Sequence, residues 1–111
     1  MENKVNFMNY PAVYKNTTFY NEFYDHLENS KGINKAEYNL IISKRDINLY
    51  VNNNMVPHYG FKITNLKKYF GIKGTGKKLL NSFMEVYNQY FELKNEMIEK
   101  AKIGPVELTA F

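Results

Sequence analysis

The chain has 111 residues and a formal net charge of +4, and this length corresponds to one ordinary domain. Hydrophobic residues make up 44% and charged residues 23%, which is the composition of a folded chain and not of a disordered one. Cysteine is absent, which excludes a disulfide scaffold, a thiolate metal site and a cysteine nucleophile. We expect a single compact domain over residues 1–111.

The start of the chain and its composition predict the cellular location. No apolar run approaches the roughly 18 residues of a membrane span, and the polar start Met1–Lys4 leads into no apolar signal stretch. Five residue types with A/T-rich codons supply 56 of the 111 residues: 16 Asn, 14 Lys, 10 Tyr, 8 Phe and 8 Ile. We therefore expect a cytoplasmic protein of a low-GC bacterium, and the small size suits a phage or mobile element of that host.

The N-terminal part predicts an extended segment followed by a helix. Residues 1–16 contain short apolar alternation that ends at Tyr10-Pro11, which is typical of an edge strand. Asn16–Thr18 are three good N-cap residues, and a helix is expected over 18–29. Its inward face has residues three and four apart: Phe19, Tyr20, Phe23, Tyr24 and Leu27.

The middle of the chain predicts a β-hairpin with strands at 37–43 and 47–52, joined by a turn at Lys44–Asp46. Alternate apolar residues share one face of each strand: Tyr38, Leu40 and Ile42, then Ile47, Leu49 and Val51. Asn52–Asn54 offers a further turn, and Met55–Pro57 a short third strand at the sheet edge.

The C-terminal part predicts two helices. A short one over 65–71 has Thr64 as its N-cap and closes at Gly71 in a left-handed conformation. A long amphipathic one follows over 76–102. The predicted fold is therefore α+β: an N-terminal helix, a small antiparallel sheet, a short helix and a long C-terminal helix.

The apolar stripe of the long helix is wide in its first four turns, so two sides must be covered. We favour coverage by the rest of the domain. The alternative is a partner chain or a homodimer, with Tyr87, Tyr90 and Phe91 at the protein interface.

The positive charge is confined to one segment. Residues 60–80 contain six lysines and no acidic residue, whereas residues 1–59 sum to zero. Such clustering is the electrostatic pattern of a polyanion-binding surface, and a solvated lysine face is the competing interpretation. We therefore expect the nucleic-acid-binding residues to be Lys62, Lys67, Lys68, Lys73, Gly74, Thr75, Gly76, Lys77 and Lys78.

Two motifs overlap this segment, and each has departures. Gly71–Lys78 nearly matches the phosphate-binding pattern G-x-x-x-x-G-K-[ST], but Lys78 replaces the magnesium-binding hydroxyl and no strand precedes the loop. A helix-turn-helix, or its winged variant with the preceding hairpin, also fits the order of elements. Lys67 and Lys77 stand where that motif has a small and an apolar residue.

Residues suited to catalysis are sparse. His26 and His58 are the two histidines, and neither has metal-ligand spacing with another ligand residue. We expect both to be surface or packing residues, and we expect no enzyme activity, cofactor or metal.

The leading hypothesis is a small non-enzymatic protein that binds nucleic-acid backbone, or a nucleic-acid-handling complex, through the lysine-rich helix-loop-helix segment 62–78. The alternative is a protein-binding inhibitor of a host defence system, of the anti-CRISPR or another anti-defence type. The ten tyrosines suit that alternative because tyrosine anchors protein interfaces.

Overall fold

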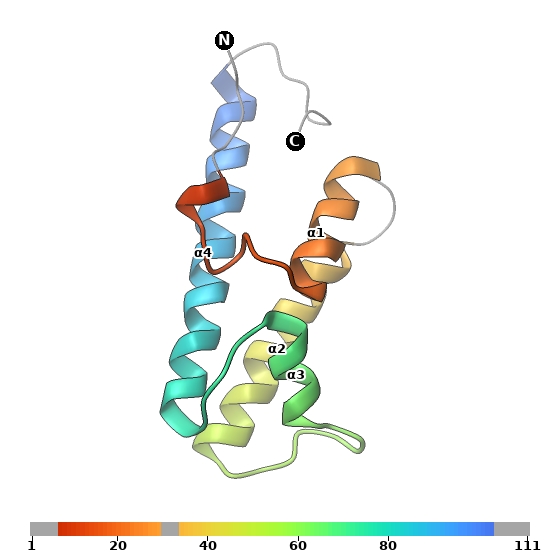
Figure 1. Cartoon of the computed structure of the whole chain (residues 1–111), viewed down its shortest axis with the longest axis vertical. Helices are drawn as coiled ribbons and strands as arrows, with labels where there is room; N and C mark the ends of the chain where they lie inside the picture. The colour runs from red at the N-terminus through yellow and green to blue at the C-terminus, as the bar shows by residue number, and fades with distance from the viewer. Residues whose placement is uncertain (1–6, 30–33, 104–111) are drawn as a thin grey trace.

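The computed structural model describes residues 7–29 and 34–103, which form an all-helical fold (Figure 1). A short 3-10 turn precedes the α-helices: η1 Phe7–Asn9, α1 Thr18–Asn29, α2 Lys35–Asn52, α3 Ile63–Phe70 and α4 Gly76–Ile103. These two ranges contain no strand, so the predicted α+β fold with a small antiparallel sheet is wrong.

The residues predicted to form the hairpin form one continuous helix, α2. It begins after Asn34, whose side-chain Oδ1 accepts a hydrogen bond from Glu37 N at 3.1 Å, as an N-cap residue does. Lys44–Asp46, the expected turn, lies in the middle of this helix. Met55–Pro57, the expected third strand, belongs to the irregular connection between α2 and α3.

The physical reason for this error is that the segment carries two apolar periods. Ala36, Leu40 and Ile47 are buried, and spacings of four and seven residues place them on one helix face. Tyr38 and Ile41, on the other side, are 59% and 49% exposed. The helical period prevails because the buried face packs against α1 and α4.

The helix predicted at residues 18–29 is confirmed as α1. Its first turn is capped by Thr17, whose Oγ1 accepts a hydrogen bond from Tyr20 N at 3.0 Å. Phe19 and Phe23 are buried, as the spacing predicts, whereas Tyr24 is exposed.

The predicted N-terminal edge strand is wrong where it can be compared. Residues 7–17 form η1 followed by turns and bends, and the remainder of the predicted segment lies outside the described residues. This N-terminal segment packs on α4 from far away in the sequence. Ala12 N donates a hydrogen bond to Gln89 Oε1 at 2.8 Å, and the Tyr10 hydroxyl donates one to the Glu96 carboxylate.

Both predicted C-terminal helices are confirmed, as α3 and α4. The predicted N-cap of α3 is wrong, because α3 follows Lys62, which makes no side-chain capping hydrogen bond. Gly71 ends α3 with a φ of 67°, in the left-handed region that favours glycine. A Cβ at this position would also lie 2.5 Å from Thr17 Cγ2, so the site requires glycine for space as well as for conformation.

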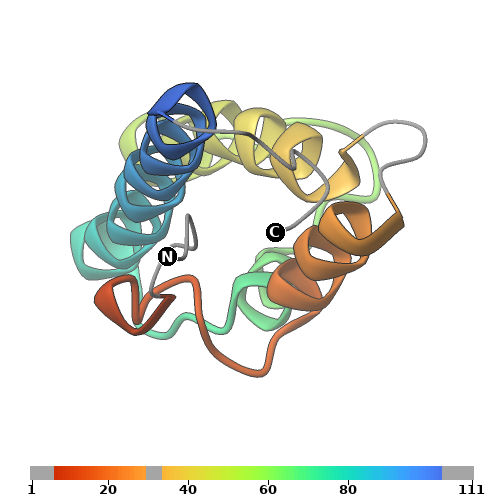
Figure 2. The same ribbon diagram turned by 90° about the horizontal axis from the view of Figure 1, so that it is seen from above.

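Seen from above, the helices surround a shared core (Figure 2). Aromatic rings from different helices meet edge-on or tilted there, with centroids 5.1 Å apart for Phe19 and Phe70 and 5.3 Å apart for Phe70 and Phe83. Tyr90 joins Phe19 at 5.7 Å. These contacts tie α1, α3 and α4 together through aromatic packing.

A buried polar contact fixes α2 to α4. The Tyr90 hydroxyl, in a side chain only 1% exposed, donates to Glu37 Oε1 at 2.8 Å and accepts from Asn34 Nδ2 at 3.0 Å. Lys94 Nζ also binds Glu37 Oε1 at 2.8 Å. Burial, with help from Glu37, raises the pKa of Tyr90. Burial acts to raise the pKa of Glu37 too, but the hydrogen bonds from Lys94 and Tyr90 outweigh it, so that pKa is lowered.

Candidate nucleic-acid interface

The predicted contact residues all lie in the described part of the chain, and we call the six lysines the lysine segment. Lys62 precedes α3, Lys67 and Lys68 lie in its last turn, Lys73 lies in the connection 71–75, and Lys77 and Lys78 lie in the first turn of α4. All are exposed except Lys67, which is half-buried. Within the described ranges, none of the six is within ion-pair distance of a carboxylate.

The two ends of this segment differ in their fit to the helix dipoles. Lys67 and Lys68 stabilise the C-terminal end of α3, where the dipole favours cations. The first turn of α4 has Lys77 and Lys78 and no acidic residue, at the end that favours anions. Each of these two lysines costs about a few tenths of a kcal/mol there, and a bound phosphate would offset that cost.

The backbone between the two helices is built around glycine. Gly74 has a φ of 106° and Gly76 a φ of 56°, conformations that other residues rarely adopt. The N–H of Leu79 donates to Thr75 O at 3.4 Å, whereas the N–H groups of residues 76–78 precede the helical hydrogen bonds. These N–H groups lie at the N-terminal end of α4, where Lys77 and Lys78 also lie. The predicted glycine contacts and two of the predicted lysines are therefore together at that end.

The connection 71–75 does not make the sharp bend of a helix-turn-helix. In Figure 1 it runs back from the end of α3, so that α4 begins toward the end of the molecule where α3 also begins. The winged variant is excluded, because its expected hairpin is the helix α2. The six lysines are therefore spread over α3, the connection 71–75 and the start of α4, and they do not surround one point. This arrangement suits a polymer with many phosphates better than a single phosphate.

One cation near this path was missed by the sequence reasoning. Lys15 Nζ donates a hydrogen bond to Gly71 O at 3.0 Å, across the end of α3. Burial lowers the pKa of Lys15, and nearby Glu85 partly offsets that effect. Lys15 and Lys73 both line a pocket of about 310 Å³ beside α4. No sequence signal points to Lys15, because it lies far from the lysine segment along the chain.

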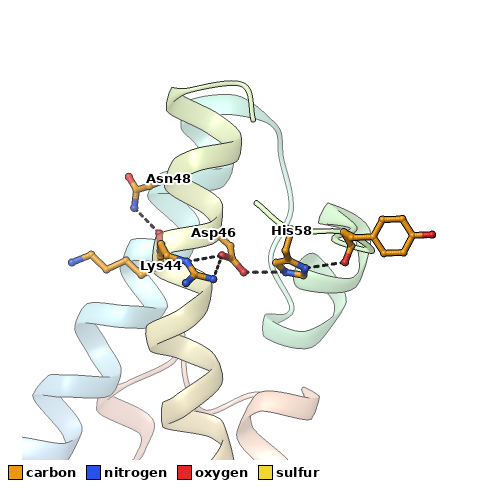
Figure 3. Close-up of polar contacts among 6 residues, drawn as sticks. Lys44, Asp46, Asn48 and His58 are labelled. Carbon is orange, nitrogen blue, oxygen red and sulfur yellow. Dashed lines mark hydrogen bonds and ion pairs between the residues drawn. The ribbon is translucent and has the colours of Figure 1, made fainter. Parts of the chain in front are cut away.

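A second pocket, of about 300 Å³, lies between α2, α3 and the turn at residues 58–61. Its most buried polar residue is Asp46, whose side chain is 6% exposed. Arg45 binds Asp46 Oδ1 through Nε at 3.0 Å and through Nη2 at 2.9 Å. Figure 3 shows Asp46 with its other oxygen, Oδ2, directed at His58 Nε2, 3.4 Å away.

His58 links the turn to α2. Its Nδ1 lies 3.2 Å from Tyr59 O, so each ring nitrogen faces an oxygen acceptor (Figure 3). Its ring also contacts Phe61 edge-on, with centroids 5.6 Å apart. The expectation that both histidines are surface or packing residues fits these placements. His26 is half-buried, and its Nδ1 has no hydrogen-bond partner among the described residues.

The residues expected at a protein interface are placed differently from one another. Tyr90 is inside the fold and hydrogen-bonded, so its side chain offers no surface to a partner. Tyr87 and Phe91 are half-buried, with ring centroids 4.9 Å apart, and Lys44 Nζ lies 4.8 Å from the Tyr87 ring centre. Whether a partner covers them stays a prediction.

Comparison of the chain with protein-family models, with curated proteins and with solved structures gives no match. Among the described helices, none is both long enough and apolar enough to cross a bilayer. In the same residues, no three or more acidic or histidine side chains group around a point where they could hold a metal ion.

Proposed function

We propose that this protein binds the sugar–phosphate backbone of nucleic acid through the lysine segment and the backbone of Gly74, Thr75 and Gly76. The observation that carries the proposal is six lysines within 21 consecutive residues, with no carboxylate neutralising any of them in the described part of the chain. Each is available to a phosphate, and phosphate contacts supply most of the non-specific affinity for nucleic acid.

The choice of lysine indicates what these contacts do. Lysine binds phosphate as a point charge and positions a strand, whereas base reading in a groove relies mostly on arginine. Arg45 is held on Asp46 by two hydrogen bonds. The lysine segment therefore binds strands with little regard to sequence. The proposal includes the expected setting: a phage or mobile-element protein in the cytoplasm of its bacterial host.

The test is the salt dependence of binding to a labelled DNA oligomer, followed by fluorescence anisotropy. With six phosphate contacts on duplex DNA, the slope of log affinity against log salt would approach about −5. Lys73→Gln, Lys77→Gln and Lys78→Gln together should make the slope shallower by about 3. Lys35→Gln, at an exposed lysine of α2 outside the segment, is the control for removing a lysine charge elsewhere and should leave the slope unchanged. A slope near zero, or a triple variant that binds like the parent, would refute the proposal.

A second candidate is a protein-binding inhibitor of a host defence system, favoured by exposed apolar side chains away from the lysine segment. Tyr38 and Ile41 lie together on α2, and Met55 and Val56 are 52% and 67% exposed in the next connection. Isolated large apolar side chains are normal on a surface, so this observation carries less weight. A stoichiometric host protein that stays bound after nuclease treatment, and is lost in Ile41→Lys, would favour this candidate.

A further inference from the structure

The pocket between α2, α3 and the turn at residues 58–61 has the lining of a site for a flat, polar-edged ligand. Its volume of about 300 Å³ is at the lower end of small-molecule sites. Planar and apolar side chains form part of the wall: Ile42, Phe61, Leu66, Tyr69 and Phe70. Gly60 and six polar residues complete the wall: Asn39, Ser43, Asp46, His58, Lys62 and Asn65.

Several of these polar groups have hydrogen-bonding capacity left. The Ser43 hydroxyl and the Asn65 side-chain amide make no hydrogen bond to any described residue. Asp46 Oδ1 accepts two hydrogen bonds from Arg45, while Oδ2 has only the longer contact of 3.4 Å to His58. A carboxylate oxygen accepts more than one donor, so Oδ2 can take another from a ligand.

The pocket is held in shape without a ligand. His58 bridges Asp46 on α2 and Tyr59 O in the turn, and Phe61 N donates to His58 O at 3.1 Å. The Phe61 ring packs on Tyr50 of α2, with centroids 5.7 Å apart. These contacts fix His58 and Phe61 against α2, so a ligand would pay little to order the site.

Lys62 connects the pocket to the lysine segment, because it belongs to both. We propose that the pocket receives an unpaired nucleobase of a single strand whose phosphates lie along the lysine segment, with guanine preferred. An unstacked base is recognised by aromatic walls and by hydrogen bonds to its edge, whereas a base within a duplex is paired and cannot enter. This inference rests on the proposed function and names its substrate class.

The carboxylate gives the reason for guanine. Guanine presents a ring N–H and an exocyclic amino group side by side, and both can donate to Asp46 or to the oxygen of Asn65. Thymine presents a single ring N–H between two carbonyl oxygens, which the carboxylate repels. Thymine is therefore the poorest occupant, and a strand of thymidines reports on the lysines alone.

The experiment compares two labelled single-stranded DNAs of equal length by fluorescence anisotropy: an all-thymidine strand and the same strand with one central guanine. The parent protein should bind the guanine strand about fivefold or more tightly than the all-thymidine strand, since one well-paired base edge discriminates by at least that factor. Asn65→Leu places an apolar side chain at the pocket wall. It should reduce the difference, because guanine loses the Asn65 oxygen as an acceptor while Asp46 remains, and the all-thymidine affinity should stay unchanged.

Thr64→Leu is the matched control, because Thr64 is exposed on the same helix and does not line the pocket. It should keep the guanine preference, and thermal unfolding should confirm that both variants fold. Equal binding of both strands by the parent protein overturns the inference but leaves the proposed function standing. Loss of the preference in Thr64→Leu as well also overturns it.

Guanosine monophosphate separates the two possible sources of the base. Competition only at concentrations far above those of the guanine strand supports a strand as the ligand. Tight binding of free guanosine monophosphate that Asn65→Leu weakens, together with no detectable binding of either strand, would overturn both the strand proposal and the proposed function.

Discussion

Lys94, in the second half of α4, is held by Glu37 of α2 at 2.8 Å, whereas Lys77 and Lys78, in its first turn, meet no carboxylate in the described ranges. The residues beside these lysines differ in the same way. Tyr90 shares Glu37 with Lys94, while glycines adjoin the first-turn lysines. One helix therefore carries charge in two settings: paired charge joins it to α2, and unpaired charge stands exposed in its first turn. Substitutions at the two ends should have separable effects.

The largest effect on stability should come from Tyr90→Ala. This substitution empties a core position, leaves Asn34 Nδ2 without its acceptor and removes one of the donors to Glu37, which should lower the free energy of unfolding by about 3–5 kcal/mol. Tyr90→Phe keeps the ring and should cost about 1–3 kcal/mol. Urea unfolding followed by circular dichroism measures both. Equal costs for the two variants would show that packing contributes nothing beyond the hydroxyl.

Alkaline pH should weaken the contact between the N-terminal segment and α4. The hydrogen bond to Glu96, and then burial, raises the pKa of Tyr10 to about 12, above its ordinary value of 10. A raised pKa contributes stability that is fully present below pH 10 and is lost as pH rises toward 12. Urea unfolding between pH 9 and 11 should therefore show falling stability. The fall should be shallower in Tyr10→Phe, and identical slopes would argue against the contact.

The smallest and most direct comparison is between two lysines of α4. Lys94→Gln removes a half-exposed ion pair and should cost about 1 kcal/mol of stability. Lys77→Gln removes a cation from the first turn and should stabilise by about a few tenths of a kcal/mol. In the anisotropy assay the order reverses, because Lys77→Gln should weaken DNA binding and Lys94→Gln should not. The contrast fails if both variants behave alike in both measurements.

Helices α1, α3 and α4 were predictable because each has one unambiguous apolar period, and two of them have a clear boundary residue: Thr17 for α1 and Gly71 for α3. α2 was not, because its buried face includes Asp46 and half-buried Asn39 and Ser43, which interrupt the helical period. The decisive local signal was Asn34 followed three residues later by Glu37, the spacing of an N-cap contact.

The candidate site also has one part that the sequence predicts and one that it does not. The lysine segment is visible in sequence because it is contiguous. The pocket is not, because Asn39, Asp46, His58 and Asn65 meet only once α2 is a helix and α3 packs beside it. In the predicted turn at Lys44–Asp46 the Asp46 side chain would lie at the surface, whereas in the helix α2 it is buried.

The N-terminal segment has a consequence for biosynthesis. Tyr10, Ala12 and Lys15 bind Glu96, Gln89 and Gly71, partners that lie 86, 77 and 56 residues later. A ribosome releases those partners well after the segment itself, so the segment stays undocked, with Val13 uncovered, until α4 has emerged. We expect nascent chains arrested before Gln89 to remain protease-sensitive at Tyr10, and protection to appear only when the second half of α4 has left the exit tunnel.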